Sequence, residues 1–476
     1  MSFMTSLSGG RGGYAPRRGR GGSSRPFVKR QDPVKPDLTK YPLGELLVSL
    51  RTSNLEPSNT HLSLPQIEDC QYVASYNWLA EHSTILVPGQ PPQWTPLKIA
   101  RRLPEDSGTY YRDPNAAHYP EYPIAPAVKA IMDTTDDTIV GADFFACGST
   151  LGNLLRFVRG IDKAFRFSVE TIGDIVFLIR KENDPKELIE GVRGFGHTFP
   201  EAYTTWPKGV QGSETHQRIV QYNLGGLQCL VRFECDGFFD NSTKPSSSEA
   251  SRGKDPAALP SEDVLAQTLA GTAVSNPQTT STGPLTIRHR GSIVSQNSIF
   301  DLKTRSGKYK KEINMDDITP QLWLKQIPNF IVAYHDGAGM FEDIQIQDVR
   351  SLVSTWEKDN ARSIRLLIAL LKKIIDVAKA DQGGLLEVYC SGTGELEIRK
   401  QVGDGVHALP TALSEEWARR CESDGGFQFT EDTGYGASPD FPNDSFDDSY
   451  DDSDDDGKDF TACSADDCGY CGRCTY

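Results

Sequence analysis

Residues 230–238 combine a strand pattern with a concentrated set of charges. Apolar and polar residues alternate there at a period of two, which predicts a β-strand. Residues two apart point to the same face of a strand, so Arg232, Glu234 and Asp236 share one face. The opposite face carries Val231, Phe233 and Cys235. Because such charges are costly to bury alone, we expect a partner or a metal ion at this face.

A second short stretch, 298–304, carries complementary charges. Asp301 and Lys303 share one face of a predicted strand, with apolar side chains behind them. A carboxylate strand followed by an acid-x-lysine strand is typical of metal-dependent nucleases. In such sites the carboxylates hold Mg²⁺, while the lysine orients the attacking water and offsets the charge of the phosphate. The two stretches together predict metal-dependent hydrolysis of phosphodiester bonds.

The composition of the chain changes at both ends. Residues 1–40 have low complexity, residues 41–420 alternate strand and helix patterns, and residues 421–476 are acidic. The segment 240–290 is rich in Ser, Thr, Pro, Ala and Gly, which indicates a disordered insertion between the two charged strands. The clearest helix pattern, 360–380, has a wide apolar stripe that should pack on a sheet. We therefore expect a mixed α/β (α+β) domain with disordered N- and C-terminal tails.

The net charge of −15 is concentrated in one segment. From Cys421 to the end, sixteen Asp and Glu residues face only Lys458 and Arg473, so the other 420 residues carry a net charge of −1. The body of the chain is therefore compatible with a nucleic-acid partner. We expect no signal peptide and no membrane span, because no long uncharged apolar run is present. The scattered cysteines suit a reducing compartment, so we expect a nuclear or cytoplasmic protein.

Two further motifs accompany the charged strands in a fixed order. In chain order, the four motifs are Gly196–His197–Thr198–Phe199–Pro200–Glu201, Glu234–Cys235–Asp236, Asp301–Leu302–Lys303 and Trp323–Leu324–Lys325–Gln326. With these motifs the chain resembles the decapping exoribonuclease (DXO-type) family, a branch of the PD-(D/E)XK nuclease fold. The resemblance covers about residues 75–400.

The resemblance implies a PD-(D/E)XK-like central mixed sheet flanked by helices, and RNA as the partner. The implied catalytic residues are Glu201, Glu234, Asp236, Asp301, Lys303 and Gln326. The implied ligands of Mg²⁺ or Mn²⁺ are Glu234, Asp236 and Asp301, with Glu201 contacting the metal through water. Lys303 and Gln326 would position the attacking water and the scissile phosphate. The competing interpretation is a surface salt-bridge cluster of Arg232, Glu234, Asp236 and Lys303.

The chain departs from the family pattern at two positions that bear on activity. The family places an arginine, which handles the RNA 5′ end, on the segment that looks like 143–151, and this chain has Gly148 there. Asp301 replaces a glutamate, which shortens a metal ligand by one methylene. The alternative function is therefore a catalytically inactive nuclease-fold protein that binds RNA.

The N-terminal segment is of the RGG type. Its arginines Arg11, Arg17, Arg18 and Arg20 are separated by glycines. Glycine keeps the backbone flexible, while arginine can meet phosphates and stack on bases. We expect this segment to contact RNA; the competing interpretation is a solubilising tail.

The last residues combine a cysteine cluster with an acidic run. The clustered cysteines are Cys463, Cys468, Cys471 and Cys474. Thiolates at this spacing could hold Zn²⁺ or an iron–sulfur cluster, and we favour Zn²⁺ over both that cluster and free thiols. The acidic run could bind a protein partner, or shield the RGG segment by mimicking nucleic acid. Residues 447–451 also match the DDxxD spacing of prenyl diphosphate synthases, a remote alternative because those helical enzymes carry two such motifs.

Overall fold

A computed structural model describes residues 35–55, 65–81, 83–135, 141–189, 192–240, 284–307, 313–381, 384–392 and 394–422. The chain divides into two units, 1–32 and 33–476, and every described residue lies in the second. The predicted RGG segment, the acidic run and the cysteine cluster lie outside the described residues, as does most of the predicted insertion. Those interpretations stay predictions.

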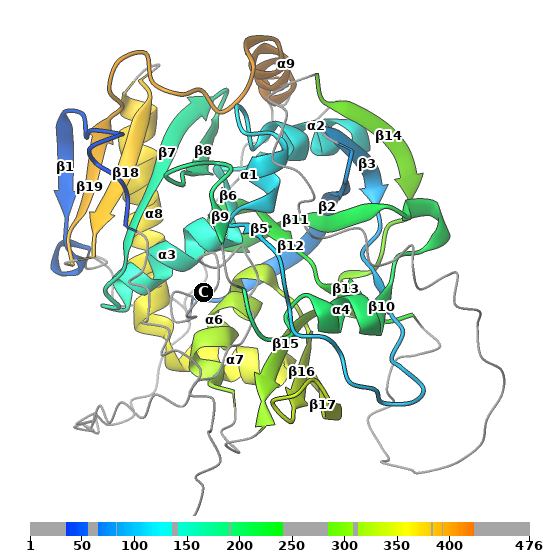
Figure 1. Cartoon of the computed structure of the whole chain (residues 1–476). Helices are drawn as coiled ribbons and strands as arrows, with labels where there is room; N and C mark the ends of the chain where they lie inside the picture. Colours follow the sequence, from blue (N-terminus) through cyan, green and yellow to red (C-terminus); the bar gives the residue numbers. More distant parts are fainter. Residues whose placement is uncertain are drawn as a thin grey trace, which may run out of the picture. The chain divides into compact units, whose positions relative to one another are not determined.

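An eleven-stranded mixed sheet forms the centre of the described unit (Figure 1). Its strand order is β1 (Leu46–Leu50), β19 (Leu396–Lys400), β18 (Leu386–Ser391), β7 (Ala164–Ile172), β8 (Ile175–Arg180), β6 (Phe144–Cys147), β12 (Leu227–Glu234), β11 (Ser213–Leu224), β2 (Ile67–Leu79), β3 (Thr84–Gly89) and β14 (Thr286–Gly291). Strand β6 runs parallel to both β8 and β12, and β14 runs parallel to β3. The other described pairs in this sheet are antiparallel.

A six-stranded sheet stands beside the first. Its order is β10 (Thr204–Thr205), β4 (Gln93–Trp94), β13 (Gly237–Phe238), β15 (Ile299–Ser306), β16 (Asn329–His335) and β17 (Phe341–Asp348). A two-stranded sheet pairs β5 (Tyr110–Tyr111) with β9 (Leu188–Ile189). Three short 3-10 turns connect these elements: η1 (Thr52–Asn54), η2 (Lys208–Val210) and η3 (Gln296–Ser298).

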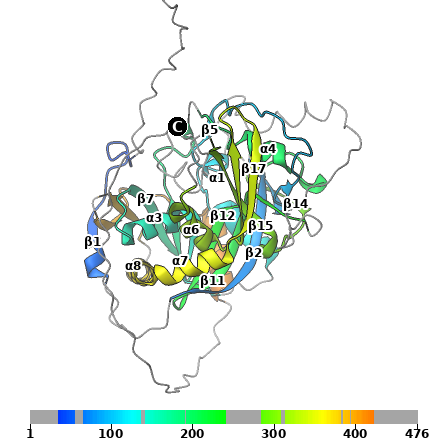
Figure 2. The ribbon, with the colours of Figure 1, turned by 90° about the horizontal axis from the view of Figure 1, so that it is seen from below.

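Helices cover both faces of the large sheet, and α4 (Thr198–Tyr203) packs on the small one. The other described helices are α1 (Pro114–His118), α2 (Ala125–Thr134), α3 (Gly148–Val158), α6 (Met315–Lys325), α7 (Arg350–Asp359), α8 (Ala361–Ala380) and α9 (Thr411–Glu422). Along β12, Val231 and Phe233 enter a core with α3, α6 and α8, whereas Leu230 enters a second core with α2 and α9. This alternation follows from the period of two in a strand. Figure 2 shows α7 and α8 following one another across the strands. The predicted mixed α+β fold with flanking helices is confirmed.

The first charged stretch is one continuous strand in the prediction but two strands in the structure. β12 ends at Glu234 in the large sheet, and β13 begins at Gly237 in the small one. The prediction was wrong here because alternation along 230–238 cannot show that the chain changes sheets. The predicted insertion is also too long at its end, since 286–291 form β14. That strand exposes most of its side chains, so it lacks the apolar signal of a core strand.

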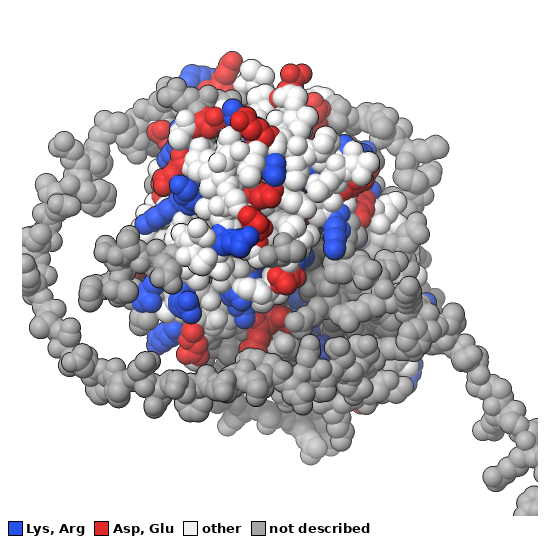
Figure 3. All heavy atoms as spheres, turned by 90° about the vertical axis from the view of Figure 1, so that its left-hand side faces the viewer, with Lys and Arg blue, Asp and Glu red and all other residues white. Residues whose placement is uncertain are grey.

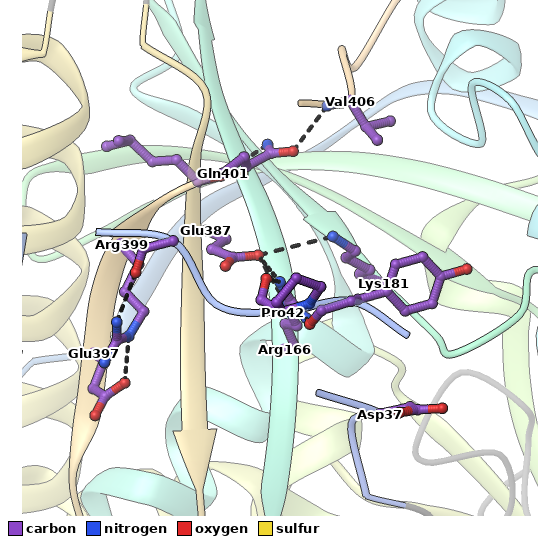
Figure 4. A network of polar contacts seen from close by, with 12 residues as sticks. Asp37, Pro42, Arg166, Lys181, Glu387, Glu397, Arg399, Gln401 and Val406 are labelled. Atoms are coloured by element: carbon purple, nitrogen blue, oxygen red, sulfur yellow. Dashed lines mark hydrogen bonds and ion pairs between the residues drawn. The ribbon is translucent and has the colours of Figure 1, made fainter. Parts of the chain in front are cut away.

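A buried ion pair within the large sheet also binds the backbone of residues 41–42. Arg166 on β7 meets Glu387 on β18, and their side chains are 4% and 0% exposed. Arg166 also donates to the carbonyl oxygens of Tyr41 and Pro42, at 2.6 and 3.3 Å (Figure 4). Lys181 Nζ lies 3.8 Å from Glu387 Oε2. The polar contacts hold the segment that leads into the edge strand β1.

Candidate functional site

The junction between the two sheets places Asp236 beside β15. Gly237 pairs with Phe300 across the β13–β15 ladder, so the preceding residue comes next to Asp301. Asp236 Oδ2 accepts a hydrogen bond from the Leu302 backbone N–H at 2.7 Å. The carboxylate thus accepts from a backbone N–H of β15 just before β13 begins. This bond fixes the orientation of the half-buried Asp236 side chain.

Asp301 lies between two lysines from different elements. Lys303 Nζ on β15 lies 2.9 Å from Asp301 Oδ1, and Lys325 Nζ, at the end of α6, lies 3.3 Å from Asp301 Oδ2. The three residues are only 2%, 3% and 1% exposed for Asp301, Lys303 and Lys325. Charged side chains are rarely buried so deeply unless they are paired. Two members of the competing surface cluster, Lys303 and Arg232, are thus buried, at 3% and 4% exposed, whereas Glu234 and Asp236 are half-buried.

The two aspartates have pKa values shifted in opposite directions. Burial, followed by the charge of Asp301, raises the pKa of Asp236 to about 7 against the opposing effect of the lysines and the Leu302 N–H. Burial also disfavours the charged form of Asp301, but Lys303 and Lys325 outweigh it and lower its pKa. Neighbouring carboxyl groups whose pKa values separate in this way are typical of functional sites.

Glu234 is the last residue of β12 and belongs to an adjacent polar group. Gln217 on β11 faces it across the ladder and donates to Glu234 Oε2 at 3.5 Å. The other end of the same amide accepts from Arg232 Nη1 at 2.5 Å. Arg232 and Glu234 therefore share one face of β12, as the period of two predicts. Gln217 is fully buried and was not among the predicted site residues.

Glu201 lies on α4, whose first turn is held by Asp106. Asp106 Oδ1 accepts from the backbone N–H of Thr198 at 2.9 Å, and Oδ2 accepts from that of His197 at 3.1 Å. The His197 ring stacks on Tyr110, with ring centroids 3.7 Å apart. Burial raises the pKa of Tyr110, and the charges of Asp106 and Glu201 raise it further. The structure thus groups Glu201 with Tyr110 and Asp106.

Gln326 terminates α6 with a left-handed backbone, φ +51°, and its side chain turns back to donate to the Trp323 carbonyl at 2.6 Å. The neighbouring Lys325 is the α6 residue that contacts Asp301. A signal for Lys325 is present in the sequence. Ile318, Leu322 and Lys325 lie at i, i+4 and i+7, so the buried face of the helix ends on the lysine.

Gly148 starts α3 directly beside Lys325. A Cβ atom placed on Gly148 would lie 3.7 Å from Lys325 Cγ and 3.8 Å from Lys325 Cε. At the position where the resemblance calls for an arginine, the nearest cation is thus a lysine that comes from α6. A small cavity lies nearby, lined in part by Cys147, Arg180 and Arg232.

Asp236 and Asp301 provide the donor set for a hard divalent ion. In the part of the chain that the structure describes, no three His, Cys, Asp or Glu side chains gather into a metal-binding group. The structure therefore does not assemble the predicted three-carboxylate set that includes Glu234. Mg²⁺ usually keeps several waters and takes only one or two carboxylates together with substrate phosphates. Two aspartates with this environment fit such a site.

The fold and the site define an α+β protein with two aspartates and two lysines at a junction of two sheets. By sequence, the chain belongs to the family described as "Domain of unknown function (DUF8563)", whose family model matches residues 46–399. No curated protein matches the sequence significantly. No helix in the described ranges is both long and apolar enough to cross a membrane.

Three solved structures illustrate what the chain is similar to. S. pombe Rai1 is 12% identical with a TM-score of 0.47, covering 75% of this chain and 99% of its own. Candida albicans Rai1 in complex with pU5 and Mn²⁺ is 9% identical with a TM-score of 0.48, covering 78% and 99%. K. lactis Dxo1 in complex with manganese is 9% identical with a TM-score of 0.41, covering 76% and 99%. These proteins are of the decapping exoribonuclease family that the motifs resemble. Similarities this weak say nothing about activity.

Proposed function

We propose that this chain hydrolyses RNA phosphodiester bonds in a reaction that depends on Mg²⁺ or Mn²⁺, with RNA 5′ ends as its substrate. The observation that carries the proposal is the buried contact of Asp301 with Lys303 at 2.9 Å, next to an Asp236 carboxylate fixed by the Leu302 N–H. Carboxylates can hold the divalent ion of metal-assisted phosphoryl chemistry, and a lysine beside them can offset the charge of the phosphate. The preference for 5′ ends rests on the motif resemblance.

The residues of the site have different roles in the proposed hydrolysis. Held by Asp236 and Asp301, a divalent ion would polarise the phosphoryl oxygen and offset charge on the leaving oxygen. Lys303 donates from β15 to the attacking water and to the phosphate, because its ammonium carries three donors. Burial strengthens each of these electrostatic contacts. The roles of Glu201, Glu234 and Gln326 rest on the motif resemblance, since their described contacts are with Tyr110, Gln217 and Trp323.

A second candidate is an RNA-binding protein that retains the fold without catalysis. One observation favours it: both oxygens of Asp301 already face ammonium groups, so this carboxylate is neutralised. The remote alternative, a prenyl diphosphate synthase, needs an all-helical chain, and the described unit is built on large sheets.

RNA contact outside the site is assigned to the RGG segment. On the face in Figure 3, lysine and arginine side chains are interspersed with acidic ones. A mixed face of this kind attracts a phosphate backbone less than a basic stripe does. We expect a nuclear or cytoplasmic protein, a prediction from the cysteine pattern.

The proposal is tested by RNA degradation with purified protein and Mg²⁺ or Mn²⁺. The RNAs carry a 5′-phosphate, a 5′-triphosphate or a cap. Asp236→Ala/Lys303→Ala should lose on the order of 10²-fold or more in rate, because each residue contacts the reacting groups. The matched control, Asp343→Ala/Lys358→Ala, removes two exposed charges and should keep full activity. RNA binding without cleavage of any substrate would select the non-catalytic candidate.

A further inference from the structure

We infer that Lys325 occupies the place of a second metal ion, so that the site takes one divalent ion rather than two. The inference rests on the proposed function and specifies its cofactor. Two-metal sites hold their ions about 3.5–4 Å apart around a shared carboxylate. Here the shared carboxylate is Asp301, whose Oδ1 faces Lys303 at 2.9 Å and whose Oδ2 faces Lys325 at 3.3 Å. Lys303 belongs to the acid-x-lysine motif, so Lys325 is the additional cation, and it lies at the oxygen that a second ion would take.

Lys325 is placed by the fold and cannot withdraw into solvent. Its side chain is 1% exposed, and its stem packs on Gly148 at the start of α3. A lysine on a surface helix would turn its ammonium to water, but this one has no such path. The Lys325 side chain therefore stays beside Asp301.

The backbone around Lys325 is fixed by side chains from other elements. The last carbonyl groups of a helix have no partner within it. At the end of α6, Tyr222 on β11 donates to the Leu324 carbonyl at 3.1 Å. Gln296 in η3 donates to the carbonyls of Lys325 and Gln326, at 3.3 and 2.9 Å. The position of Lys325 is thus fixed from both β11 and η3.

The summed charge of the site also favours one divalent ion over two. Asp236 and Asp301 together carry two negative charges when ionised, and Lys303 and Lys325 carry two positive ones. One divalent ion makes this site positive enough to attract a phosphodiester. A second divalent ion would face both lysines at short range in a buried setting, where repulsion is strong. The Lys325 ammonium supplies the second positive charge instead.

The test counts bound Mn²⁺ by calorimetric titration and records the Mn²⁺ electron paramagnetic resonance spectrum. We expect one ion in the unmodified protein and an uncoupled spectrum. Lys325→Gln frees an oxygen of Asp301 and adds an amide oxygen, so it should bind two ions with a spin-coupled spectrum. Lys325→Met frees the same oxygen with an apolar stem of similar length, and it serves if the Gln variant does not fold. The control Lys373→Gln, on the exposed face of α8, should bind one ion.

Each result decides between the alternatives. Two ions in the unmodified protein would overturn the inference and leave the metal-dependent function intact. One ion in the unmodified protein and still one in both folded variants would show that Lys325 does not limit the number. No Mn²⁺ bound to the unmodified protein, even with RNA present, would overturn the proposed function itself.

Discussion

At the scale of single residues, a buried histidine outside the candidate site, His216, makes the stability of the fold depend on pH. His216 on β11 is 1% exposed, and its Nδ1 lies 2.6 Å from Asn77 Oδ1. Asn77 Oδ1 also accepts from the Gln90 N–H, so it is an acceptor for the imidazole as well. Burial, and next the charge of Arg218, lower the pKa of His216 well below 6.5. The neutral imidazole is therefore the form that the fold stabilises.

The sign of the resulting pH dependence follows from linkage. Above pH 6.5 the imidazole is neutral in both states, so His216 adds no pH dependence. Below pH 6.5 the unfolded chain takes up a proton that the folded chain refuses, so stability is lost as the pH falls. Between pH 7.5 and 5.5 this loss in the free energy of unfolding amounts to about 1.4 kcal/mol.

Urea unfolding at both pH values should show that loss in the unmodified chain but not in His216→Gln. The exposed His289→Gln is the control; equal losses in all three proteins would contradict the account.

Elements show where the sequence can predict the site and where it cannot. The residue types of β12 and β15 predicted an acid–lysine cluster, because alternation fixes which side chains share a face. The spacing of Ile318, Leu322 and Lys325 favours the lysine, but it does not by itself exclude Gln326. The choice between the two depends on where α6 ends, and the left-handed turn at Gln326 depends on contacts with η3 and β11. The break between β12 and β13 depends likewise on pairing with distant strands.

The contacts of Arg166 with Glu387 and with the backbone of residues 41–42 give a stability prediction at the element scale. Arg166→Met leaves the fully buried Glu387 with Lys181 as its remaining cation among the described residues, and removes the donors to Tyr41 and Pro42. We expect a loss of about 3 kcal/mol in the free energy of unfolding, the usual cost of breaking a buried pair. Faster amide hydrogen exchange across β1 should accompany it.

Two comparisons check the origin of that loss. Arg51→Met breaks an exposed pair with Glu395, whose side chains are 66% and 36% exposed for Arg51 and Glu395, so it should cost less than about 1 kcal/mol. Arg166→Met/Glu387→Met removes both buried charges and should recover part of the stability lost in Arg166→Met. A double variant less stable than the single one would show that the arginine acts by packing, not by compensating Glu387.

At the scale of the whole molecule, charge is separated along the sequence. The acidic segment after Cys421 holds nearly all of the net charge of −15, while the first forty residues carry the RGG arginines. We propose that the acidic run competes with RNA for these arginines, because opposite charges linked within one chain have a high effective concentration for each other. Deleting residues 425–459 should tighten RNA binding on the order of tenfold at 50 mM salt, and the gain should shrink at 200 mM salt because screening weakens both contacts. Fluorescence anisotropy with a 5′-phosphorylated RNA measures the affinity.

Replacing Arg11, Arg17, Arg18 and Arg20 by Gln should abolish the gain in RNA affinity that the deletion produces. Equal affinities with and without residues 425–459 at low salt would show that the acidic run leaves the arginines free.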